Sequence, residues 1–84
     1  MYKQITAGNL YDFQQKITGR TNSDIFIKPL VVLEIQKMTP RDYDKLAEEI
    51  NTKKLRILHE KKDGTIEQII FDKKSDFNEQ VNQI

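Results

Sequence analysis

The apolar run Leu30-Val31-Val32-Leu33, which continues through Glu34 to Ile35, constrains the fold more than any other part of the chain. A short run of branched apolar residues between polar segments is typical of a buried strand. The sequence therefore predicts a strand over 25–37, with its main part at 30–36. In such a strand alternate residues face opposite sides, so that Leu33 would lie with Val31 and Ile35 in the core.

The residues after this run predict an amphipathic helix. Thr39 is a good N-cap residue, and Pro40 is favoured at the first helical position. The helix would end at Asn51-Thr52. Its covered face would hold the apolar residues that follow at helical spacing, which are Tyr43, Leu46, Ala47 and Ile50.

Three further elements follow from local signals. Asn9 is a helix cap, and a helix over 9–18 would bury Leu10, Phe13 and Ile17 before Gly19 ends it. The segment Lys61-Lys62-Asp63-Gly64 places a glycine where a hairpin turn needs positive φ, between strands at 54–60 and 65–72. Ser75 would then cap a last helix, whose buried face would hold Phe77, Val81 and Ile84.

Together these elements predict an α+β fold in a single domain over residues 1–84. The order would be α-β-α-β-β-α, with three helices and a three-stranded, mostly antiparallel sheet. We favour the strand order 1-3-2, in which the last strand is central and all neighbours are antiparallel. The alternative order, 3-2-1, has a parallel pair of first and second strands joined by a crossover connection.

Composition restricts the classes of function. The chain has 84 residues and no cysteine, so it has no disulfide framework. Its net charge of +1 gives no support for a strongly basic nucleic-acid binder. The longest apolar run has four residues, far fewer than the ~20 of a membrane-spanning helix. We therefore expect a cytoplasmic protein without membrane contact. Eleven lysines against three arginines suggest an AT-rich genome, such as that of a phage or other mobile element.

Chemistry-bearing motifs are weak in this sequence. His59 is the only histidine, no Gly-x-Ser-x-Gly segment accompanies Ser23 or Ser75, and no phosphate-binding glycine loop is present. We therefore predict a protein that is not an enzyme and has no catalytic residues, metal, cofactor or small-molecule substrate. His59 itself is expected at a strand end, half exposed.

In the predicted strands, apolar residues occur at both odd and even positions and so on both faces of the sheet. We therefore expect both faces to be at least partly covered. Helices could cover both, or part of this apolar surface could be an interface, since small domains often gain core by self-association. The sequence therefore predicts a protein-interaction module (an adaptor, inhibitor or assembly factor) that binds another protein or a second copy of itself. The candidate partner-binding residues are Tyr11, Leu30, Val32 and Leu58.

The alternative hypothesis is weak nucleic-acid binding. In an antiparallel hairpin, the residues just before the first strand lie beside the residues just after the second strand. Cations would then gather at the base of the hairpin, where they could contact a phosphate backbone. The residues of this predicted cluster are Lys53, Lys54, Arg56, Lys73 and Lys74.

Overall fold

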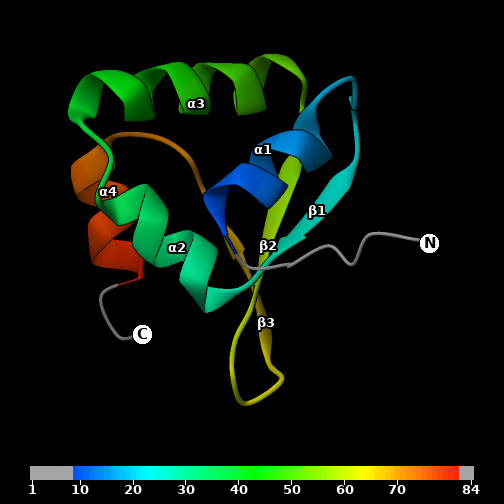
Figure 1. Ribbon diagram of the computed structural model, residues 1–84, viewed down its shortest axis with the longest axis vertical. Coiled ribbons are helices and arrows are strands. Elements are labelled where there is room, and N and C mark those ends of the chain that lie inside the picture. The colour runs from blue at the N-terminus through cyan, green and yellow to red at the C-terminus, as the bar shows by residue number, and fades with distance from the viewer. Residues whose placement is uncertain (1–8, 82–84) are drawn as a thin grey trace.

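The computed structural model describes residues 9–81, which contain four helices and three strands. Figure 1 shows how these elements are arranged. Along the chain these elements are α1 (Leu10–Ile17), β1 (Asp24–Ile27), α2 (Pro29–Gln36), α3 (Pro40–Thr52), β2 (Arg56–Glu60), β3 (Ile66–Ile69) and α4 (Lys74–Gln80). The predicted α+β class is confirmed. The predicted count of three helices is wrong, because the described residues contain a fourth helix, α2, where a strand was expected.

The apolar run at 30–35 forms a helix rather than a strand. Pro29 occupies the first turn of α2 after the extended residue Lys28, which suits the fixed φ of proline. The buried residues of α2 are Val31, Val32 and Ile35, a spacing that belongs to one helical face. Leu33 lies on the other side and is 43% exposed. Burial of this face against the core outweighs the modest preference of valine and isoleucine for strands.

The sheet is mixed, with the strand order β1-β2-β3. β1 runs parallel to β2, with Ile25 opposite Ile57, and β2 runs antiparallel to β3, with Ile57 opposite Ile69. The favoured strand order 1-3-2 is therefore wrong. The structure has the alternative order, in which β2 is central and pairs in parallel with β1. The first strand is shorter than predicted, since it ends at Ile27, and α2 and α3 together connect it to β2.

The locally signalled elements agree closely with the predictions. The side chains of Asn9 and Thr39 accept hydrogen bonds from the backbone N–H groups of Asp12 (2.8 Å) and Asp42 (3.1 Å), which caps α1 and α3. Gly64 has a φ of 91°, as the hairpin turn requires. The last helix differs, because its N-cap is Lys73 rather than Ser75. Ile84, predicted on its buried face, lies outside the described residues.

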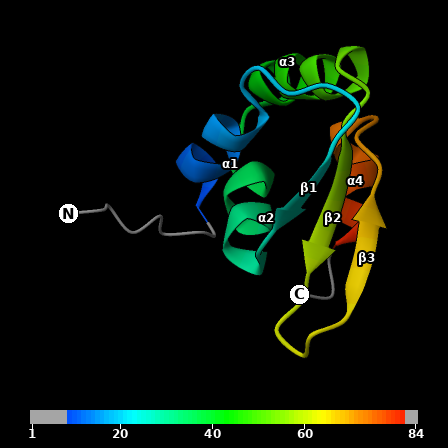
Figure 2. The same ribbon diagram turned by 90° about the vertical axis from the view of Figure 1, so that its right-hand side faces the viewer.

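The helices pack on one face of the sheet. Buried side chains from all four helices join Ile25, Ile27, Ile57 and Ile69 in a single core, in which the rings of Tyr43, Phe71 and Phe77 are in contact. Figure 2, turned by 90° from Figure 1, shows α4 behind β2 and β3. The expectation that both faces are covered is therefore wrong for the described residues.

Candidate functional site

The uncovered face of the sheet carries an apolar patch. In the strand register Phe26 of β1 lies opposite Leu58 of β2, which lies opposite Gln68 of β3. Phe26 is 45% exposed and Leu58 is partly exposed, while Ile66 and Ile70 are both more than half exposed. We call the four apolar residues Phe26, Leu58, Ile66 and Ile70 the open sheet face.

Two ion pairs flank the open sheet face. Arg56 donates from Nε and Nη2 to the two carboxylate oxygens of Asp24 at 2.9 and 2.6 Å, and Lys28 Nζ lies 2.6 Å from Glu60 Oε1. The hydrogen bond from Arg56 lowers the pKa of the Asp24 carboxyl below its ordinary value. Each cation is matched by an anion, so the surroundings of the patch have balanced charge.

The four predicted partner-binding residues do not form one surface. Leu58 belongs to the open sheet face. Tyr11 and Leu30 are exposed, at 65% and 53%, but they lie on α1 and α2 in the helical layer. Val32 is fully buried in the core because it faces inward from α2, so its assignment to an exposed surface is wrong.

Sequence reasoning did not include Phe26, Ile66 and Ile70 among the partner-binding residues, although Ile66 and Ile70 fall on one face of the predicted last strand. The structure exposes and buries alternate residues of the segment Asp24-Ile25-Phe26-Ile27, but its three consecutive apolar residues show no such alternation in the sequence. The longer apolar run nearby was also taken as the main part of the strand.

The predicted cation cluster is largely engaged within the protein. Arg56 pairs with Asp24. Lys53 Nζ donates to the Ile17 carbonyl at 3.0 Å and lies 3.2 Å from Glu49 Oε2, and Lys74 Nζ donates to the Gln36 carbonyl at 2.8 Å. Three of the five cations therefore hold other parts of the fold together. This engagement favours the apolar surface over nucleic-acid binding as the candidate site.

His59 is not half exposed as predicted but fully buried. It faces the helical layer from β2, because it shares the side of the sheet with Ile57, and in the register it lies between Ile27 and Glu67. Its Nδ1 is 3.6 Å from Glu67 Oε1, and the other oxygen of this carboxylate is 3.3 Å from Lys61 Nζ. Burial lowers the pKa of His59 below its ordinary value of 6.5, although Glu67 opposes the shift.

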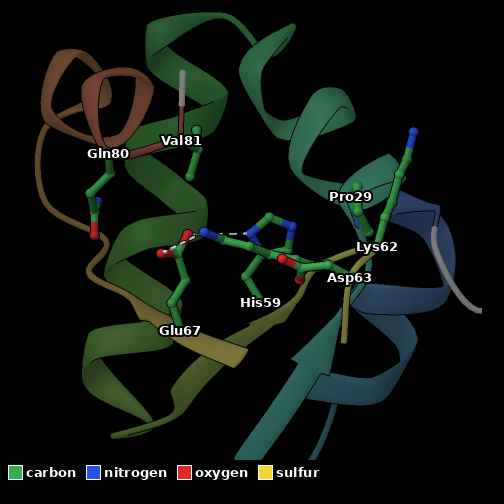
Figure 3. Close-up of a pocket in the computed structure, with 8 residues that line it drawn as sticks. Pro29, His59, Lys62, Asp63, Glu67, Gln80 and Val81 are labelled. Carbon is green, nitrogen blue, oxygen red and sulfur yellow. Dashed lines mark ion pairs between the residues drawn. The ribbon is translucent and has the colours of Figure 1, made fainter. Parts of the chain in front are cut away.

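A pocket of about 290 Å³ lies beside His59 at the hairpin end of the sheet. Figure 3 shows His59 and Glu67 beside one another, with Pro29, Lys62 and Asp63 on the other side of the imidazole ring. The complete set of lining residues is Pro29, His59, Lys61, Lys62, Asp63, Glu67, Gln80 and Val81. The volume is at the small end of the range for ligand sites in proteins.

Residues 9–81 offer neither a metal site nor a membrane span. No group of three or more metal-type side chains lies close enough together to hold an ion. None of the helices there is long and apolar enough to cross a membrane. Comparison with known proteins found no matching family model, no similar curated protein and no similar solved structure.

Proposed function

We propose that the protein is a non-enzymatic protein-interaction module that associates with a second copy of itself through the open sheet face. The observation that supports this proposal is the cross-strand pair of Phe26 and Leu58, extended by Ile66 and Ile70, on a side of the sheet that no helix within residues 9–81 covers. Sheets of this kind normally carry polar residues on the solvent side. In a chain of 84 residues, association would add core that the small fold lacks.

The charges around the patch favour a second copy over a strongly charged partner. The flanking groups comprise two cations and two anions, already matched as Asp24–Arg56 and Lys28–Glu60. Two such faces can therefore pack against each other without repulsion between like charges. In sheet-on-sheet packing the facing layers interdigitate at about 10 Å, which suits side chains of the size of phenylalanine and isoleucine.

The size of the face sets the expected strength. Three strands of four, five and four residues, about 4.8 Å apart with about 3.3 Å per residue, give a projected face of roughly 200 Å². A standard stable interface buries about 800 Å² on each partner. Association through this face should therefore be weak, with a Kd of roughly 0.1–1 mM. A module of this strength would serve as an adaptor, inhibitor or assembly factor that acts at high local concentration.

Light scattering behind a sizing column, over a concentration series up to about 1 mM, tests the proposal. The wild-type protein should shift toward a dimer as its concentration rises, with little dependence on salt. Phe26→Ser should keep the protein monomeric. Tyr11→Ser is the matched control, because it removes an aromatic side chain that is more exposed than Phe26 but lies on α1. Circular dichroism would show that each variant is folded.

Two results would overturn the proposal. One is a wild-type protein that remains monomeric over the whole series. The other is a dimer that Phe26→Ser leaves unchanged, which would place the interface elsewhere. A dimer that is lost in Tyr11→Ser but kept in Phe26→Ser would show that the interface lies in the helical layer.

A further inference from the structure

We propose that the pocket beside His59 binds a small carboxylic acid that also carries a hydroxyl group, with the hydroxyl donating to His59 Nε2 and the carboxylate facing Lys62. This site is separate from the open sheet face, because His59 faces the helical layer whereas Phe26 and Leu58 face the other side of the sheet. It therefore does not depend on the proposed self-association.

The hydroxyl requirement follows from the protonation of the imidazole. Nδ1 lacks a hydrogen-bond partner among the described residues, but Glu67 Oε1 lies 3.6 Å from it. A nearby carboxylate favours a proton on the nitrogen that faces it, so we assign the ring proton of the neutral imidazole to Nδ1. Nε2 is then a bare acceptor. It is buried and has no hydrogen-bond partner among the described residues. A buried polar atom without a partner is costly, and a ligand that donates to it removes that cost.

The carboxylate requirement follows from the charges that line the pocket. Lys61 is held by Glu67, and Asp63 Oδ1 accepts from both the backbone N–H and the hydroxyl of Thr65. Within residues 9–81, Lys62 has no ion-pair partner, although it lines the same pocket. Lys62 and His59 line the same pocket, to which Pro29 and Val81 contribute apolar walls. In Figure 3 Lys62 lies on the same side of the imidazole ring as Pro29, and its amino group points away from the ring, so it would have to turn toward a bound carboxylate.

The volume limits the ligand to a small molecule. About 290 Å³ equals roughly ten water molecules at ~30 Å³ each. An acid with about six to ten non-hydrogen atoms fills a space of this size. The imidazole is fully buried beside this space, so binding at Nε2 requires side chains that line the pocket to move.

The test compares para-hydroxybenzoate with benzoate, which differ only in the hydroxyl group, and lactate with propionate as an aliphatic pair. Each acid is titrated to about 10 mM into the full chain while a long-range proton–nitrogen spectrum records the His59 ring. At least one hydroxylated acid should bind about tenfold more tightly than its partner and shift the Nε2 resonance, as one buried hydrogen bond predicts. The free protein should show the Nδ1–H tautomer.

Two variants locate the site. His59→Phe should abolish the difference between the two acids of a pair, and Lys62→Gln should weaken binding of both. Lys45→Gln is the control, since Lys45 lies on α3 outside this pocket. His59→Phe could disturb folding. The comparison of each acid with its partner on the wild-type protein therefore tests the proposal without this variant. Absence of binding by both hydroxylated acids, equal binding within each pair, or shifts that Lys62→Gln leaves unchanged would overturn the proposal.

Discussion

The side-chain amide of Gln80 in α4 hydrogen-bonds in both directions with the backbone of Ile70, just beyond the end of β3. The Ile70 N–H donates to Gln80 Oε1, and Gln80 Nε2 donates to the Ile70 carbonyl, each at 3.0 Å. The glutamine thus pairs with one residue as a neighbouring strand would. It satisfies backbone groups where the sheet ends and ties α4 to the hairpin.

Replacing Gln80 should loosen this junction. We expect Gln80→Ala to lower the free energy of unfolding by about 1 kcal/mol, because two exposed hydrogen bonds are lost. Amide hydrogen exchange at Ile70 should become faster. Gln68→Ala, an exposed position on β3, is the control and should change stability by less than about 0.5 kcal/mol. Unchanged exchange at Ile70 would show that these bonds do not hold the junction closed.

The helical state of the run at 30–35 is tested by two alanine substitutions. In a strand Leu33 and Ile35 would share a face, whereas in α2 Ile35 is fully buried and Leu33 is 43% exposed. Ile35→Ala should therefore cost about 2–5 kcal/mol by opening a cavity, and Leu33→Ala less than about 1 kcal/mol. Chemical denaturation measures both. Similar large losses at the two positions would contradict the helix.

Acid should destabilise the protein through His59. Its pKa is lowered in the folded state, chiefly by burial, so below an unfolded-state pKa of 6.5 the unfolded chain binds more protons than the folded one. The free energy of unfolding should therefore decrease as the pH falls from about 7 to about 5. His59→Gln should flatten this dependence, since the lowered pKa values of Asp24 and Asp63 act only below about 3.8. A wild-type stability that rises on acidification would refute the neutral buried histidine.

The cap of α3 offers a fourth test. Thr39 Oγ1 accepts from the backbone N–H of Asp42 at 3.1 Å and satisfies one of the free donors at the helix start. Thr39→Ala should lower the free energy of unfolding by about 1 kcal/mol. Thr52→Ala removes the same atoms from the last turn of α3, where they cap nothing, and should be close to neutral. Thermal unfolding of the two variants in parallel gives the comparison.

The elements that could be predicted from sequence are those with a local cause. Asn9 and Thr39 cap α1 and α3 through their own side chains, and Gly64 provides the positive φ of the hairpin turn. The apolar spacing in α3 predicted its buried face, which comprises Tyr43, Leu46, Ala47 and Ile50. In each case residues within a few positions of one another settle the conformation.

The candidate sites could be predicted only in part. Leu58 was identified, but Phe26 was not, because its exposure depends on which side of the sheet the helices cover. The burial of His59 and its closeness to Glu67 arise from the pairing of β2 with β3 and from the helical layer above them. Neither is visible in the spacing of residues along the chain.

The sequence by itself determined two capped helices, the hairpin and the α+β class, since capping, periodicity and turn geometry act over a few residues. The tertiary structure decided whether the run at 30–35 is strand or helix, because a short, wholly apolar segment satisfies both patterns and only the surface it packs against separates them. It also decided the strand order and left one sheet face open. These outcomes depend on contacts between segments far apart in the chain, and burial in those contacts outweighs local preference.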